Sequence, residues 1–202
     1  MKDEKEMKKP LEVINFNKSD PDIDGVLFCI KALEKTKRGD HAQITTSLYV
    51  ENGEMVSTDG HRMHVYKLND PVKEGHYTVL QKSNVSILLQ KQNLSGYPPW
   101  KTVFPECMTA LIPNCYFDTI HDVVRSYVKI IRNLPDGIGL NYKYLEDLEG
   151  DGYDVSIGTK DLSFPINCMV LCKSISRKAL IMTMKVDSPK VHDFSSPDPF
   201  QF

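Results

Sequence analysis

The chain has 202 residues, 41% of them hydrophobic and 26% charged, with a net charge of −2, which is ordinary for a globular protein and excludes a globally basic nucleic-acid binder. No apolar run approaches the roughly 18–20 residues of a membrane span, and the charged N-terminus lacks a secretory signal's apolar region, so we expect no membrane partner. The five cysteines include no CxxC pair, which favours reduced, mostly buried thiols and therefore a cytoplasmic protein.

The first half of the chain predicts a helix followed by strands. The helix begins with Asp20 as N-cap and Pro21 in its first turn, and it runs to about Arg38, before Gly39. Strands are predicted at residues 43–51, 54–58, 63–68 and 76–80, and a short apolar helix at 85–89.

The second half repeats this order. An apolar stripe predicts a helix at residues 117–133, and a second short helix is expected at 140–149. Strands follow near residues 153–158, 164–172 and 179–186. A helix-then-strands order seen twice predicts an α+β fold with helices packed on antiparallel sheet. Residues 1–10 and the Pro-rich residues 188–202 are expected to be flexible ends.

The most informative stretch is the run Thr58, Asp59, Gly60, His61 and Arg62. It predicts a tight turn that follows a strand–turn–strand hairpin and precedes a third strand. The run closely resembles the bacterial DNA polymerase III β subunit, the sliding clamp, where the same five residues border the pocket that receives partner peptides. Residues 97–105 are similar to the clamp segment that crosses to the last domain, and residues 180–186 resemble its last strand.

The resemblance implies a DNA-clamp-like fold in a shortened form. Residues 11–105 would form one clamp-like unit with the turn and the crossing segment, and residues 106–187 a second, shortened one. The clamp's first domain is absent, so ring closure does not carry over automatically. Matching position by position, the resemblance implies a peptide pocket made of Leu48, Thr58, Gly60, His61, Arg62, Met63, Pro105, Leu180 and Met182. The alternative is that Arg62 pairs locally with Asp59, and that Met182 and Met184 alternate on an ordinary strand.

Two basic stripes are independent of the resemblance. Lys31, Lys35 and Arg38 are spaced i, i+4, i+7 on the first predicted helix, and the later helix repeats this spacing with Arg125, Lys129 and Arg132. Such faces suit contact with phosphates without sequence readout. The alternative is a solvated surface, and the β-branched residues at 120–131 leave a strand open for the second stripe.

No motif of an enzyme is present, so we expect no catalysis and no cofactor. His61 and His64 would lie on opposite faces of a strand, which argues against a shared metal site. The sequence favours a sliding-clamp-like replication and processivity factor. It would bind double-stranded DNA non-specifically, and DNA polymerase or other replication proteins through short peptides. A homo-oligomer would be needed for a ring. The alternative is a clamp-fold adaptor or decoy that does not encircle DNA.

Overall fold

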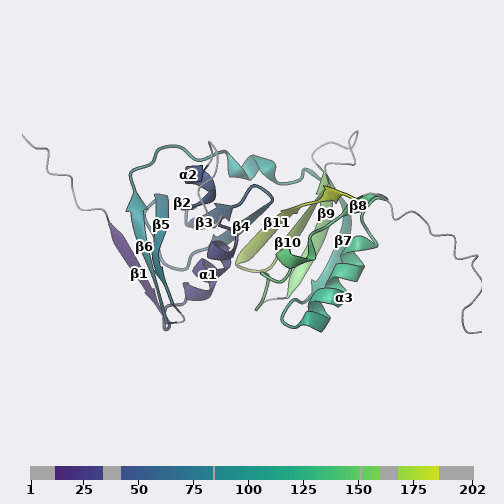
Figure 1. Ribbon diagram of the computed structural model, residues 1–202, viewed down its shortest axis with the longest axis horizontal. Coiled ribbons are helices and arrows are strands. Elements are labelled where there is room, and N and C mark those ends of the chain that lie inside the picture. Colours follow the sequence, from purple (N-terminus) through teal and green to yellow (C-terminus); the bar gives the residue numbers. More distant parts are fainter. Residues whose placement is uncertain (1–11, 34–41, 84, 151, 160–167, 187–202) are drawn as a thin grey trace, which may run out of the picture.

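The computed structural model describes residues 12–33, 42–83, 85–150, 152–159 and 168–186. Ten of their strands, with the bounds given below, form an antiparallel sheet in the order β1-β6-β5-β2-β3-β4-β11-β10-β9-β7, and the other two, β8 and β12, pair in a separate sheet. Helices α1 and α3 lie along one side of the molecule, and the segment that carries the short helix η1 crosses the other side (Figure 1). Within the described ranges, no helix has the length and apolar character needed to cross a membrane.

Among its described residues, the first half contains one principal helix, one short helix and six strands. Its elements are β1 (Val13–Asn17), α1 (Ile23–Lys31), α2 (Ala42–Thr45), β2 (Leu48–Glu51), β3 (Glu54–Thr58), β4 (Arg62–Lys67), β5 (Gly75–Lys82) and β6 (Ser86–Gln92). The second half follows the 3-10 helix η1 (Trp100–Val103). Its elements are β7 (Cys107–Cys115), α3 (Ile120–Ile131), β8 (Ile138–Gly139), the 3-10 helix η2 (Tyr142–Tyr144), β9 (Tyr153–Thr159), β10 (Cys168–Lys173), β11 (Arg177–Met182) and β12 (Met184–Lys185).

The two halves share one plan. In the second half, β7, β9, β10 and β11 are neighbours in chain order, with α3 between β7 and β9. In the first half, β2, β3 and β4 are also in chain order, and the hairpin β5–β6 is inserted between β1 and β2. The halves join where β4 pairs with β11 in the antiparallel direction, with Met63 opposite Leu180. The predicted α+β fold of repeated helix-plus-antiparallel-strand units is therefore confirmed.

Helix α1 is held on the sheet by hydrogen bonds to the carbonyls of its last turn. The Ser57 hydroxyl donates to the Cys29 carbonyl at 2.6 Å, and the His64 Nδ1 lies 2.7 Å from the Phe28 carbonyl. Burial lowers the pKa of His64 to about 3, so the ring is neutral and Nδ1–H is the donor. Because side chains from β3 and β4 satisfy these carbonyls, the helix ends at Lys31 rather than at Arg38 as predicted.

The start of α1 also differs from the prediction, because the N-cap is Asp22 rather than Asp20. The Asp20 carboxylate instead accepts a hydrogen bond from the Asp22 N–H at 2.9 Å. The buried Asp22 carboxylate accepts hydrogen bonds from the Tyr66 hydroxyl, from the main-chain and side-chain N–H groups of Asn69, and from the Asp70 N–H. It therefore ties the helix start to the loop after β4.

We expect Asp22→Asn to weaken the acid dependence of stability. Burial alone would raise the pKa of Asp22, but the hydrogen bonds from Asn69, Asp70 and Tyr66 hold it below its usual value. The folded state then binds the proton less readily, so this group stabilises above about pH 4 and its contribution is lost as the pH falls. At pH 7 the variant should lose about 1–3 kcal/mol, measured by urea unfolding at pH 7, 5 and 3. The exposed Asp24→Asn is the control, and identical pH profiles for both variants would contradict the assignment.

Three predicted elements were wrong in type. Residues 85–89 were expected to be helical but lie at the start of strand β6, which pairs with β1 on one side and β5 on the other. Ile87 and Leu89 are fully buried while Leu88 is only partly so, a period of two that a short apolar run conceals. Residues 42–45 form helix α2, so the first long strand begins at Leu48 rather than at 43. Residues 140–149 contain only the single turn η2.

Two edge strands, β1 and β7, were not predicted. Strand β7 contains Pro113, and its pairing with β9 shifts register between Ile112 and Cys115, where Asn114 has a φ of 54°. Proline is tolerated there because β7 lies at the sheet edge. The last predicted strand is divided into β11 and β12 at Thr183, whose hydroxyl donates to the Cys168 carbonyl at 2.6 Å. The expected flexible ends, and residues 164–167 of a predicted strand, lie outside the described residues.

Two hydrophobic cores lie on the sheet. The larger one includes residues from α1, α3 and the strands beneath them. The smaller one lies under the crossing segment and consists of Val56, Met63, Val65, Trp100, Met169, Leu171 and Leu180, with Tyr49, Tyr97 and Phe104 packed against it. All five cysteines are free thiols, and all but Cys107 are buried, as the sequence predicts.

Candidate functional site

The turn between β3 and β4 is closed by its own polar groups. The Thr58 hydroxyl donates to the Arg62 carbonyl at 2.7 Å and accepts from the Gly60 N–H at 3.1 Å. The Asp59 carboxylate accepts from the N–H groups of His61 and Arg62, both at 3.0 Å. Gly60 has a φ of 86°, which favours glycine at this position. Thr58, Asp59 and Gly60 therefore each have a structural role within the turn itself.

The Arg62 guanidinium connects the two halves of the molecule. Its Nε donates to Asp59 at 3.1 Å, its Nη2 donates to the Lys31 carbonyl at 2.6 Å, and its Nη1 donates to the Asp147 carboxylate. The guanidinium carbon also lies 4.6 Å from the centre of the Tyr144 ring. The side chain is only 13% exposed. The local pairing with Asp59 that we held as the alternative is therefore present, and it belongs to a larger network.

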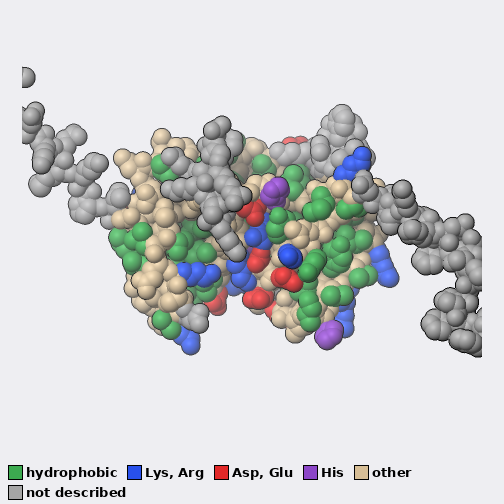
Figure 2. All heavy atoms as spheres, viewed as in Figure 1, with side chains coloured by type: hydrophobic (Ala, Val, Ile, Leu, Met, Phe, Trp, Pro, Cys, Tyr) green, Lys and Arg blue, Asp and Glu red, His purple; other side chains and the backbone are tan. Residues whose placement is uncertain are grey.

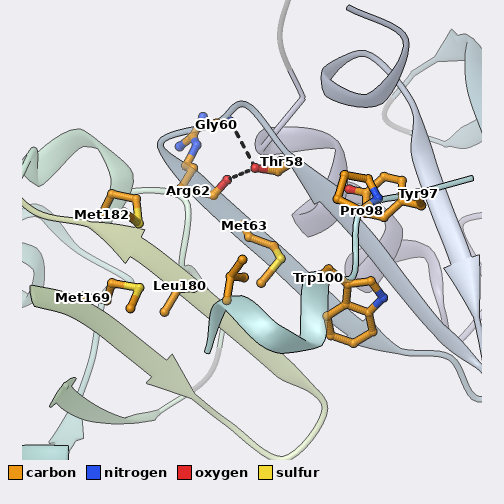
Figure 3. Close-up of a pocket in the computed structure, with 11 residues that line it drawn as sticks. Thr58, Gly60, Arg62, Met63, Tyr97, Pro98, Trp100, Met169, Leu180 and Met182 are labelled. Carbon is orange, nitrogen blue, oxygen red and sulfur yellow. Dashed lines mark hydrogen bonds between the residues drawn. The ribbon is translucent and has the colours of Figure 1, made fainter. Parts of the chain in front are cut away.

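A cleft of about 420 Å³ lies beside this turn, where the crossing segment passes over the β4–β11 junction. Met169, Leu180 and Met182 form one side and Tyr97, Pro98 and Trp100 the other, with Met63 between them (Figure 3). The full lining is Thr58, Gly60, Arg62, Met63, Tyr97, Pro98, Trp100, Val103, Met169, Leu180 and Met182. Its walls are mostly apolar, with three flexible methionines, which suits a peptide that inserts apolar side chains.

The crossing segment is fixed in place by its aromatic residues. Trp100 is 5% exposed, its Nε1 donates to the Glu51 carboxylate at 3.2 Å, and its ring meets Phe104 edge-on. Tyr97 stacks on Tyr49 with ring centres 4.4 Å apart. These contacts hold one wall of the cleft against β2 and β4, so the cleft is largely formed before any ligand arrives.

The structure brings together six of the nine residues assigned to the pocket. Thr58, Gly60, Arg62, Met63, Leu180 and Met182 line the cleft, whereas Leu48, His61 and Pro105 do not. Leu48 is fully buried in the larger core, where a ligand cannot reach it. His61 is exposed in the turn, and its carbonyl accepts from the Met182 N–H at 2.9 Å. Pro105 is buried against Gly158.

Five lining residues were missed by sequence reasoning: Tyr97, Pro98, Trp100, Val103 and Met169. Four of them belong to the crossing segment, which the sequence singled out without assigning its side chains to the wall. No sequence pattern assigned Met169 to the cleft, because its position there depends on the pairing of β10 with β11. In that pairing Met169 lies opposite Met182.

The two predicted basic stripes differ in how far the structure describes them and in whether their charges are exposed. Lys31 reaches Glu149 at 3.2 Å and the Asp147 carbonyl at 3.4 Å, so its charge is used inside the molecule. Lys35 and Arg38 lie outside the described residues, and α1 ends at Lys31. In contrast, Arg125 and Lys129 on α3 and Arg132 at its C-cap are all exposed. The predicted helix, rather than a strand, is present at this stripe.

Metal ligation has no support among the residues that the structure describes. They contain no group of three or more His, Cys, Asp or Glu side chains that could hold an ion. His64 is buried and bonded to α1, whereas His61 is exposed. The two side chains therefore lie in different environments, and His61 belongs to the turn rather than to β4.

Comparison by sequence and by structure gives different results. No protein-family model matches the chain, and no curated protein matches it. By structure it resembles the β subunit of bacterial DNA polymerase III. The Borrelia burgdorferi protein, solved in complex with a natural product, matches with a TM-score of 0.52 and 12% identity over 90% of this chain and 65% of that one. The Helicobacter pylori β clamp bound to a DNA ligase peptide matches with a TM-score of 0.54 and 11% identity, over 89% and 67%.

A third solved structure agrees with these two. The Thermotoga maritima β subunit matches with a TM-score of 0.52 and 10% identity, over 92% of this chain and 69% of that one. The chain therefore has the fold of the bacterial sliding clamp, and it spans about two thirds of the length of the clamps that it matches. At this level of identity the likeness describes the fold.

Proposed function

We propose that this protein binds short peptides of replication proteins in the cleft at the β4–β11 junction. The observation that carries the proposal is the cleft itself: a largely apolar groove under a fixed crossing segment, beside the turn at residues 58–62. The likeness to the Helicobacter pylori clamp, which was solved with a DNA ligase peptide, supports a peptide as the ligand. Apolar anchors on a short peptide would displace water from the cleft and bury its methionines.

The polar groups around the cleft define what it can recognise. The Arg62 guanidinium is occupied by Asp59, Asp147 and the Lys31 carbonyl, so its aliphatic stem rather than its charge is offered to a ligand. The Thr58 hydroxyl is used within the turn. Affinity should therefore come mainly from apolar contacts, and it should depend only weakly on salt.

We expect Met182→Ala to weaken peptide binding severalfold. Met182 is 43% exposed and lines the cleft, so truncating it removes apolar surface that a bound peptide would cover. The matched control is Met184→Ala, because Met184 is 44% exposed on β12, the next strand along the chain, but does not line the cleft. Titration calorimetry with the DNA ligase peptide of the Helicobacter pylori complex should give a Kd in the micromolar range for the unaltered chain. Equal losses in the two variants would place the peptide elsewhere.

Binding to double-stranded DNA is a second candidate function, favoured by the exposed cations of α3. If these cations meet phosphates, replacing Arg125, Lys129 and Arg132 by Glu should abolish a weak, sequence-independent binding that also disappears with added salt. Fluorescence anisotropy with a labelled duplex at 50 and 300 mM salt measures this effect. Binding that survives the triple substitution would leave these residues without a role in DNA contact.

The adaptor and the ring-forming alternatives differ in oligomeric state. The terminal strands β1 and β7 are both unpaired on their outer edges within the described sheet, and they expose Val13, Met108 and Leu111. Such edges are able to pair with another chain. Mass measured in solution at low and high concentration separates the two: a ring requires several chains, whereas an adaptor can remain a monomer.

A further inference from the structure

Helix α3 has a second apolar row that faces solvent. Its inner row, Val123, Ser126 and Ile130, is buried on the sheet. Ile120, Val124 and Val128 follow at i, i+4 and i+8 and are 59%, 53% and 39% exposed. A helix on a sheet normally presents polar residues to water, so an exposed apolar row indicates a surface that something covers. Figure 2 shows hydrophobic side chains gathered over this part of the molecule.

A row of cations lies directly beside this apolar row. With 100° of rotation per residue, Arg125, Lys129 and Arg132 lie next to the apolar row around the helix, on the side away from the sheet. All three are exposed, and none forms an ion pair with another described residue. Tyr142, also exposed, packs edge-on against Tyr127 of α3. The outer face of α3 therefore combines exposed apolar side chains with cations that form no ion pair among the described residues.

This combination restricts the occupant. Packing a second copy of α3 in antiparallel orientation would set the cations of one helix against those of the other, which is unfavourable. A DNA duplex would satisfy the cations but would leave Ile120, Val124 and Val128 without an apolar partner. A segment that carries both aromatic and acidic side chains fits both rows.

The chain itself contains such a segment. Residues 187–202 include Phe194, Phe200 and Phe202 together with Asp187, Asp193 and Asp198. The described chain ends at Val186, whose N–H donates to the Gly137 carbonyl at 2.9 Å, just beyond α3. Sixteen extended residues span about 50 Å, whereas the 12-residue α3 is about 18 Å long. We infer that residues 187–202 bind the outer face of α3 in the same molecule, with phenylalanines on the apolar row and aspartates beside the cations.

Proteolysis of the full chain tests this inference. Chymotrypsin cleaves after Phe194, and the rate is followed by intact mass. The synthetic peptide 187–202 gives the rate for the unbound segment. We expect cleavage in the full chain to be at least fivefold slower than in the peptide at 50 mM salt. The double variant Arg125→Glu/Lys129→Glu should restore the peptide's rate, and Val124→Ser should restore part of it.

The matched control is Lys18→Glu/Lys82→Glu, which changes the net charge equally at exposed sites in the first half and should keep the protection. Circular dichroism establishes that each variant is folded. Cleavage at the peptide's rate in the unaltered chain would overturn the inference, as would protection that persists in the α3 double variant. Protection that is lost on Trp100→Ala instead would place the segment in the cleft, and protection that grows with protein concentration would place it on another molecule. Both results would also overturn it. Because α3 lies apart from the cleft, these outcomes do not depend on the proposed peptide binding.

Discussion

Arg62→Ala should lower the free energy of unfolding by roughly 2–4 kcal/mol. Breaking a fully buried ion pair costs about 3–5 kcal/mol, and the loss here should be somewhat smaller because Asp147 retains some exposure. The substitution leaves the Asp59 and Asp147 carboxylates without their cation and the Lys31 carbonyl without its donor. Among the described residues, Arg62 is the only one whose side chain forms hydrogen bonds to the turn, to α1 and to the loop before β9. Urea unfolding at pH 7 measures the loss.

Lys73→Ala provides the control for this prediction. Lys73 pairs with Glu12 at 2.9 Å, but its side chain is 71% exposed, so the variant should lose less than about 1 kcal/mol. If Arg62→Ala lowered the free energy of unfolding by no more than Lys73→Ala does, the Arg62 network would contribute no more than an exposed ion pair. The interpretation of the turn as a structural connection would then be wrong.

Trp100→Ala should cost about 3–4 kcal/mol and reduce peptide binding more than tenfold. Trp100 contributes its indole to the smaller core, and it anchors the crossing segment to β2 through Glu51. Without the indole, the segment loses its most deeply buried aromatic side chain, and the wall formed with Tyr97 and Pro98 loses one of its members. Unfolding by urea gives the first effect and calorimetry with the ligase peptide the second.

Trp100→Phe distinguishes packing from the hydrogen bond. Phenylalanine keeps an aromatic wall but cannot donate to Glu51, so we expect a loss of about 1–2 kcal/mol with peptide binding largely kept. Unaltered binding by Trp100→Ala would show that the crossing segment plays no part in recognition.

The overall fold was largely predictable because its main signals are local. The stripe of α3 and the hairpin before the 58–62 turn each specify their own element. Errors arose where long-range pairing decides the structure. Residues 86–92 are a strand because β1 and β5 lie on either side, and the end of α1 is set by Ser57, His64 and Arg62 from the sheet.

The site was predictable in part, and only through the resemblance. Six of the nine residues assigned to the pocket, from the turn, β4 and β11, line the cleft, and their role in peptide binding stays a prediction. The role of Arg62 was not predictable, because Asp147 and Tyr144 come from a distant loop that sequence spacing cannot place. Leu48 was placed in the pocket by its matching position, yet it faces the larger core. Ile120, Val124 and Val128 were counted in the apolar stripe that was expected to be buried, yet they are exposed. A periodic pattern does not show which apolar residues meet the sheet.

The methionines permit the most direct test of peptide binding at the cleft. Met63, Met169 and Met182 line it, whereas Met55 is buried in the larger core and Met108 is exposed on β7. With ¹³C-methyl-labelled methionine, NMR spectra recorded during titration of the ligase peptide report each position separately. If the peptide binds at the cleft, the methyl signals of Met63, Met169 and Met182 should shift together and give the same Kd, in the micromolar range. The signals of Met55 and Met108 should change little. Unchanged cleft methyl signals at saturating peptide would contradict binding at the cleft.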